Sequence, residues 1–152
     1  MPPVETRSLG PQRIRAIRRA LLRWYDRARR DLPWRRDSAD PYATLVSESM
    51  LQQTQVATVM PFFDRFMTRF PTLEALAAAD LDDVLPYWAG LGYYRRCHHL
   101  HAAARMIVNE RHGDFPRCAE DLLALPGVGR YAAGAIASIA FGERTPAVDG
   151  NV

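Results

Sequence analysis

The stretch that decides the fold is residues 125–152, LPGVGRYAAGAIASIAFGERTPAVDGNV. It begins with a Pro-Gly-Val-Gly turn, continues into an alanine- and glycine-rich pattern that predicts a helix over residues 131–141, and closes on an acidic loop. Gly127 and Gly129 carry no Cβ, so both permit a tight turn and a close approach of the backbone. The helix that follows can hold a phosphate oxygen at its N-terminus through N–H groups and its dipole. Gly-x-Gly alone fits a plain turn between two helices at least as well.

The rest of the chain has the spacing of helices joined by polar turns. Apolar residues recur at steps of three and four, and no stretch alternates with period two between turn signals, so we expect an all-α protein. The predicted organisation is a disordered leader over residues 1–12, a basic N-terminal helix over 13–30 and a helical domain over 31–152. The hairpin lies within that domain at about residues 120–141. The other predicted helices are residues 42–51, 56–70, 73–78, 81–88, 95–111 and 120–125.

Length and composition indicate one ordinary domain with a hydrophobic core, since the chain has 152 residues of which 48% are hydrophobic. It contains no apolar run long enough to span a membrane and no signal-peptide pattern, so a soluble cytosolic protein is expected. The chain stops in a polar loop that ordinarily leads into another helix. We therefore expect it to be a fragment of a longer protein.

Charge is unevenly distributed along the chain. Residues 1–36 hold 11 arginines against three acids, a net charge of +8, whereas the remaining nine arginines face 14 acids, a net charge of −5. A basic segment on an acidic domain suggests a polyanionic partner, although a solvated helix face or a flexible arm fits equally well. All 20 basic residues are arginine, so no lysine side chain is present to form a Schiff base.

Two carboxylates are the candidate catalytic groups. Glu48 lies inside an apolar helical segment, where an ionised side chain either turns to solvent or serves a function. Partial burial would raise its pKa and suit it to general acid work near neutral pH. Asp149, in the loop near the chain end, fits a helix N-cap when taken alone. Two carboxylates on separate elements suit cleavage of a glycosidic bond, in which one protonates the leaving group and the other stabilises the sugar cation.

Four segments together resemble one family. They are VSESMLQQTQV at residues 46–56, GLGYY at residues 90–94, the hairpin, and VDGNV at residues 148–152. In this order they resemble the N-terminal catalytic part of the adenine DNA glycosylase (MutY-type) family, in the helix-hairpin-helix superfamily of base-excision glycosylases. The resemblance implies an all-α helix-hairpin-helix DNA glycosylase fold with a six-helix barrel module, truncated here. It also implies an enzyme that removes adenine mispaired with 8-oxoguanine or guanine.

The resemblance implies a role for individual residues. Glu48 would protonate adenine at N7 and then activate water, Asp149 would stabilise the sugar cation, and Tyr131 and Asn151 would support the two carboxylates. Tyr93 would insert beside the lesion guanine. Wedges of this kind are needed because a base inside a duplex must be extruded before it can react. Leu51 and Gln53 resemble such wedges, and the other expected DNA-contacting residues are Gln52, Thr54, Gly127, Val128, Gly129 and Arg130.

Two alternatives stay open at this point. The endonuclease III-like glycosylase/lyases carry a catalytic lysine two residues after the second hairpin glycine. This chain has Tyr131 there and no lysine elsewhere, which favours a monofunctional glycosylase. The other alternative is a non-catalytic DNA-binding module, which would need the hairpin but neither Glu48 nor Asp149.

The family also implies features beyond this chain. Its members continue past Val152 into a four-cysteine [4Fe-4S] loop, whereas Cys97 and Cys118 do not match that ligand spacing, so we expect no cofactor and no metal here. The N-terminal helix of the family packs against the later part, so its apolar stripe is expected to be exposed in this chain. The expected partner is double-stranded DNA with an A:8-oxoG or A:G mismatch, bound by a monomer in the nucleoid of a bacterial cytoplasm, without membrane contact.

Overall fold

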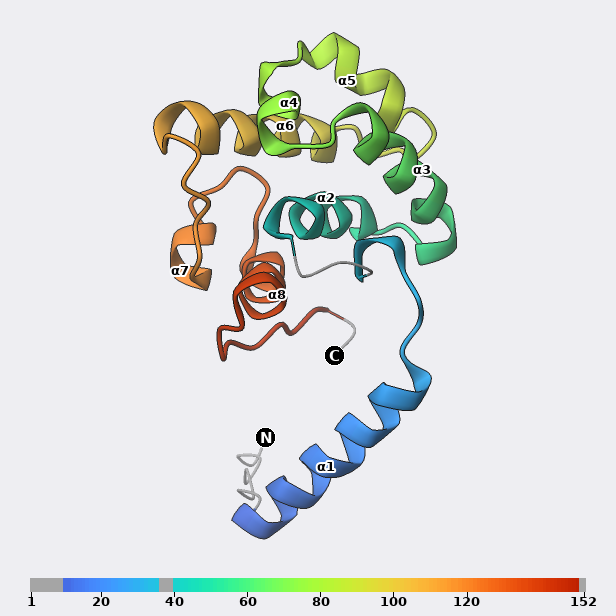
Figure 1. The fold of residues 1–152 in the computed structure, drawn as a ribbon, viewed down its shortest axis with the longest axis vertical. Coiled ribbons are helices and arrows are strands. Elements are labelled where there is room, and N and C mark those ends of the chain that lie inside the picture. The colour runs from blue at the N-terminus through green and yellow to red at the C-terminus, as the bar shows by residue number, and fades with distance from the viewer. Residues whose placement is uncertain (1–9, 36–39, 151–152) are drawn as a thin grey trace, which may run out of the picture. The chain divides into compact units, whose positions relative to one another are not determined.

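The computed structural model describes residues 10–35 and 40–150, and every regular element in that part of the chain is a helix (Figure 1). The predicted all-α class is therefore confirmed. Asn151, most of the predicted leader and the linker at 36–39 lie outside the described residues. The elements are α1 (Pro11–Ala28), η1 (Pro33–Arg35), α2 (Pro41–Leu51), α3 (Val56–Arg69), α4 (Leu73–Ala78), α5 (Leu81–Trp88), α6 (Arg95–Arg105), η2 (Met106–Glu110), α7 (Ala119–Leu122) and α8 (Arg130–Phe141).

The chain divides after Asp31 into two compact units. The first contains α1, which begins at Pro11, a residue suited to the first position of a helix, rather than at the predicted Arg13. None of the residues of α1 is buried. Trp24 is 60% exposed, and the apolar stripe of α1 is exposed, as predicted.

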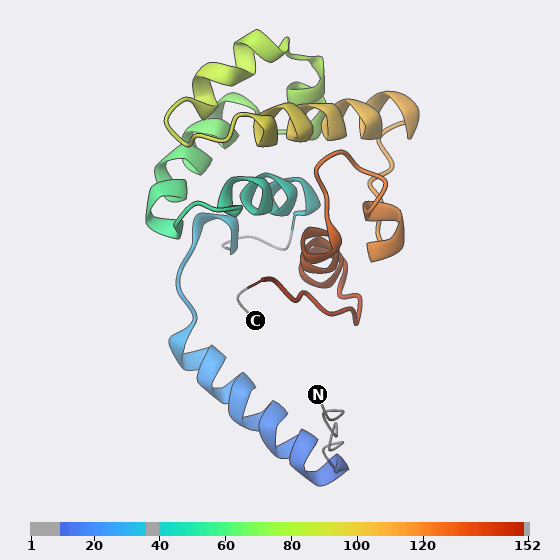
Figure 2. The same cartoon turned by 180° about the vertical axis from the view of Figure 1, so that it is seen from behind.

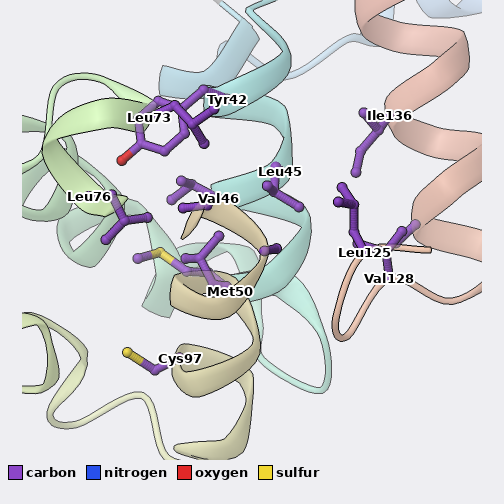
Figure 3. Close-up of a cluster of buried hydrophobic side chains, with 14 of the residues drawn as sticks. Tyr42, Leu45, Val46, Met50, Leu73, Leu76, Cys97, Leu125, Val128 and Ile136 are labelled. Carbon is purple, nitrogen blue, oxygen red and sulfur yellow. The ribbon is translucent and has the colours of Figure 1, made fainter. Parts of the chain in front are cut away.

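Helix α2 is the central element of the second unit. It starts where Asp40 accepts hydrogen bonds from the N–H groups of Tyr42 and Ala43, with Pro41 at the first helical position. It packs against α3, α6 and α8, and Figures 1 and 2 show it between α6 and α8. Leu73 and Leu76 lie on one side of α2 and Leu125, Val128 and Ile136 on the other (Figure 3). Its side chains consequently contribute to the core on both sides.

Aromatic residues fill the region between α3 and α5. A stripe of phenylalanines on α3 lies in the core, since Phe63, Phe66 and Phe70 are at most 5% exposed. The ring of Phe66 packs edge-on against the buried Trp88. Thr72 caps α4 by accepting from the N–H of Ala75. Asp80 occupies the N-cap position of α5, but its side chain makes no capping hydrogen bond.

The long helix predicted over residues 95–111 changes its winding before it ends. Helix α6 is regular to Arg105 and continues as a wider π-helical turn, η2. Gly113, with φ +82°, then donates its N–H to the carbonyl of Ile107 and stops the helix. The next predicted helix, residues 120–125, is shorter than expected, because α7 ends at Leu122.

Helix α8 ends at Gly142, which adopts a left-handed conformation with φ +69°. The chain then reverses along α8. A Cβ on Gly134 would lie 2.2 Å from the carbonyl oxygen of Pro146, so this close approach requires glycine. Glu143 accepts a hydrogen bond of 2.8 Å from the N–H of Ala119. Gly134 therefore allows the loop that follows α8 to pack directly against this helix. Within the described residues, no helix has the length and apolar character needed to cross a membrane.

Candidate active site

Glu48 projects from the middle of α2 and is half-buried. Burial raises the pKa of its carboxyl group above the usual value. Two weaker effects oppose this shift: the Tyr131 hydroxyl donates a hydrogen bond to the carboxylate, and the positive charge of Arg35 favours the ionised form. A carboxyl group with these properties holds its proton closer to neutral pH than an exposed glutamate does. It therefore has the character of a general acid.

Tyr131 links the two candidate carboxylates. It is the second residue of α8, is 39% exposed, and reaches Glu48 across the α2–α8 interface. Burial is the largest of the effects that raise the pKa of its hydroxyl, and the negative charges of Glu48 and Asp149 raise this pKa further. Both carboxylates therefore lie within electrostatic reach of one hydroxyl. The structure brings three of the four predicted catalytic residues together, and the fourth, Asn151, falls outside the described residues.

Arg35 is a site residue that the sequence analysis did not identify. It ends η1 and is exposed, and its charge acts on both Glu48 and Tyr131. Trp34, beside it, packs its ring edge-on against Phe63 at 5.3 Å between centroids, which attaches η1 to the core. Arg35 lies in an arginine-rich segment, so charge patterning alone could not single it out.

The predicted wedge residues lie in two turns near α2 and α6. Gln53 belongs to the 52–54 turn that follows α2, and Tyr93 to the 90–94 turn that precedes α6. Both side chains are exposed, and both residues adopt left-handed backbone conformations, with φ +58° and +48°. This conformation costs roughly 1–2 kcal/mol for a residue with a side chain. Leu51, Gln52 and Thr54 are half-buried beside them.

The hairpin uses its two glycines differently. Gly127 has φ +75°, and a Cβ there would lie 2.6 Å from the Cβ of His99 on α6, so both backbone and packing require glycine. Gly129 has an ordinary φ of −87° and open space where a Cβ would point. The turn therefore requires glycine at residue 127, whereas Gly129 leaves open space for a close approach. Val128 is 8% exposed and donates its N–H to the carbonyl of Leu125, whereas Arg130 is exposed.

The residues of this chain do not fit an iron–sulfur cluster. Such a cluster is held by four thiolates, and the sequence contains two cysteines. Cys97 is fully buried, and burial raises its pKa to about 12, which keeps it a thiol. Within the described residues, no three histidine, cysteine or acidic side chains are grouped to hold a metal. The histidine His101 of α6 instead bonds the carbonyl oxygen of Ala79 at 2.8 Å.

Comparison with known proteins agrees with this arrangement. Human adenine DNA glycosylase is 55% identical over 147 residues, which cover 91% of this chain and 27% of that protein. The adenine DNA glycosylase of Mycolicibacterium smegmatis is 48% identical, over 87% of this chain and 45% of that protein. The chain thus spans between about a quarter and a half of the length of the curated relatives it matches. The predicted resemblance to adenine DNA glycosylases is confirmed. Because the relatives come from animals, a plant and bacteria, the bacterial source stays a prediction.

Solved structures share the fold. A thermostable thymine-DNA glycosylase superposes with a TM-score of 0.81 at 30% identity, over 90% of this chain and 63% of that one. An endonuclease III trapped as a covalent intermediate with DNA superposes with a TM-score of 0.77 at 26% identity, over 94% of this chain and 66% of that one. Residues 46–152 match the family described as HhH-GPD superfamily base excision DNA repair protein. The segment holds Glu48, the two turns, the hairpin and Asp149, and the chain belongs to this superfamily.

Proposed function

We propose that the chain removes adenine mispaired with 8-oxoguanine or guanine from double-stranded DNA by hydrolysing the N-glycosidic bond. The observation that carries the proposal is the placement of Glu48 and Asp149 around the Tyr131 hydroxyl. A DNA-binding module without chemistry has no need of a half-buried glutamate with a raised pKa. The names of the relatives, adenine DNA glycosylases of human and bacterial origin, support the choice of adenine.

Each group has a step in the proposed reaction. Glu48, whose pKa is raised by burial, donates a proton to the base at N7, and the bond between base and sugar breaks as positive charge develops on the sugar. The carboxylate of Asp149 stabilises that charge. Glu48, now ionised, is held by the Tyr131 hydroxyl and accepts a proton from the attacking water. The proton that Glu48 gives to the base is thus replaced by the proton that it takes from the attacking water.

The same site argues for base removal without strand cleavage. A lyase step needs an amine that forms a Schiff base with the abasic sugar. Tyr131 stands two residues after Gly129, where the endonuclease III-like enzymes carry a lysine, and the chain contains no lysine. We therefore expect a monofunctional glycosylase, bound to duplex DNA through the hairpin backbone and Arg130. Such a role would place the protein with the chromosome, in the bacterial nucleoid if the source is bacterial.

The decisive experiment is a single-turnover assay with excess protein on a duplex carrying adenine opposite 8-oxoguanine, followed by alkali treatment of half the sample. Strand breaks in the alkali half alone are the expected result. Breaks in both halves would favour the glycosylase/lyase alternative, and borohydride would then trap a covalent complex. Bound but intact duplex in both halves would favour the DNA-binding module. Repeating the assay with guanine or cytosine opposite the adenine measures the mismatch preference.

A further inference from the structure

Arg96 is the most extensively hydrogen-bonded buried side chain that the site described above leaves without a role. It lies in the first turn of α6 and is 9% exposed. Its Nη1 donates to the carbonyl oxygens at the end of α2, which have no partner within the helix. These are the carbonyls of Ser49 at 3.2 Å, Met50 at 2.6 Å and Gln52. Arg96 therefore caps the helix that carries Glu48.

The second nitrogen of the same guanidinium engages both turns. Nη2 donates to the Thr54 hydroxyl at 3.1 Å and to the Gly92 carbonyl at 3.2 Å. The guanidinium carbon also lies 5.5 Å from the ring centroids of Trp88 and Tyr93. One buried cation thus connects the end of α2, the 52–54 turn and the 90–94 turn.

The acceptors of Arg96 include the peptide groups that precede the two left-handed residues. The carbonyl of Gln52 belongs to the planar peptide unit that ends at Gln53, and the carbonyl of Gly92 to the unit that ends at Tyr93. Fixing the direction of such a carbonyl restricts φ of the following residue. Among the described residues, the non-glycine residues with positive φ are Gln53, Tyr93 and His112, so Arg96 holds the peptide before two of the three.

We propose that Arg96 is a positioning residue that holds Gln53 and Tyr93 in their left-handed conformations at the same time, so that both side chains are presented to the duplex before DNA binds. This inference rests on the proposed function for its purpose, although the coupling of the two turns does not depend on it. Preorganised wedges spare the complex the cost of ordering two loops during base extrusion.

The planar fork of arginine is required for this role. Its two terminal nitrogens point in different directions, and each serves a different set of acceptors, whereas lysine offers a single nitrogen. Arg96→Lys keeps the positive charge and can satisfy only one set. The hairpin shares the neighbourhood, since a small cavity is lined by Ser49, Gln52, Arg96, His99, Pro126 and Gly127.

The first test reads the backbone directly by NMR on the labelled 152-residue chain. In the parent we expect the HN–Hα couplings and Cα shifts of left-handed residues at Gln53 and Tyr93. Arg96→Lys should abolish this signature at one or both. Arg105→Lys is the matched control, because Arg105 is an exposed arginine at the other end of α6 and its loss should change neither residue. Retention of both signatures in Arg96→Lys would overturn the proposal.

If Arg96→Lys does not fold, NMR of the arginine side chains in the parent protein tests the double engagement of Arg96 instead. A guanidinium bonded through both nitrogens rotates slowly, so the Nη groups of Arg96 should give separate, slowly exchanging signals while those of Arg105 average. Averaged signals at Arg96 would refute the double engagement.

The second test measures the consequence for DNA. With 2-aminopurine as the target base, fluorescence reports extrusion, and we expect Arg96→Lys to slow extrusion and base removal about 10²-fold, the effect of misplacing reacting groups by about 1 Å. Duplex affinity should change little, because phosphate contacts dominate it. Unchanged extrusion in the variant would overturn the proposal. If the parent itself removes no adenine, the proposed function fails, and the NMR result still decides the role of Arg96.

Discussion

Glu48 and Asp149 reach the same tyrosine from two very different surroundings. Glu48 is carried by α2, where Val46, Ser47 and Met50 are at most 1% exposed and three helices pack on the element. Asp149 is carried by a loop, residues 143–150, in which no residue is buried. That loop contacts α8 where Pro146 approaches Gly134, and Glu143 accepts a hydrogen bond from the N–H of Ala119.

The difference teaches how each carboxylate can be disturbed. The place of Glu48 is determined by many buried contacts, so its chemistry can be changed while its geometry survives. The loop that carries Asp149 meets α8 where Pro146 approaches Gly134, so its geometry can be changed from α8 without altering the carboxylate. Substitutions on the two sides should therefore fail in distinguishable ways.

The largest effect is expected from Glu48→Gln. The amide has the shape of the carboxyl group but cannot donate a proton to the base, so the rate of base removal should fall by about 10³-fold, within the range for losing a general acid. Duplex binding and the melting temperature should stay close to those of the parent or rise. Glu110→Gln, an exposed glutamate on η2, is the control. Single-turnover kinetics check the rate, and adenine release at the parent rate would disprove the catalytic assignment.

The next largest effect should come from Gly134→Val. A side chain here meets the Pro146 carbonyl, so the loop must move away from α8 and carry Asp149 with it. We expect base removal to slow about 10²-fold, the scale of a displacement near 1 Å, while Glu48 stays in place. Ser138→Ala, on the same helix, adds no atom beside the loop and should leave the rate unchanged. Parent activity in Gly134→Val would mean that the loop contact does not position Asp149.

The same contrast explains what the sequence could reveal. The helices and the core position of Phe63 and Phe66 follow from apolar spacing, because burial of one helix face imposes it. The pair Glu48 and Asp149 was identified from residue type and family motif. Arg35 and Arg96 were missed, because an arginine that serves a site or caps a helix looks like any other arginine in a chain with 20 of them. The close approach at Gly134 was missed as well, since an alanine-rich helix does not indicate what packs on it.

A smaller effect is expected from Tyr131→Phe, which removes the hydrogen bond that opposes the raised pKa of Glu48. The pKa of Glu48 should rise further, so the carboxyl group keeps its proton to higher pH. The alkaline limb of the pH–rate profile should consequently move upward, while the maximal rate falls by about tenfold or less, a loss typical of one supporting hydrogen bond. A limb that stays in place or moves to lower pH would contradict the assignment of Glu48 as the acid.

Stability supplies an independent check on the same variant. A folded-state pKa above the ordinary value contributes stability below the unfolded pKa, and this contribution is lost as pH rises through the folded pKa. Because the pKa of Glu48 should be higher in Tyr131→Phe, the stability that protonated Glu48 contributes should be lost at a higher pH than in the parent. Melting temperatures across the acidic and neutral range measure the shift, and Glu48→Gln should abolish it.

The smallest effects come from a pair that extends the comparison to the hairpin, Gly127→Ala and Gly129→Ala. Alanine at Gly127 must adopt a left-handed φ and meets His99, so unfolding should become easier by about 1–3 kcal/mol. Alanine at Gly129 meets nothing in the protein and should leave stability unchanged or raise it by about 0.4–1 kcal/mol. If DNA approaches the hairpin backbone, Gly129→Ala should still weaken duplex binding, about equally for all sequences. Denaturation titrations measure the effect on stability, and binding titrations measure the effect on duplex affinity. A Gly129→Ala protein that binds every duplex as the parent does would show that DNA does not come close to Gly129.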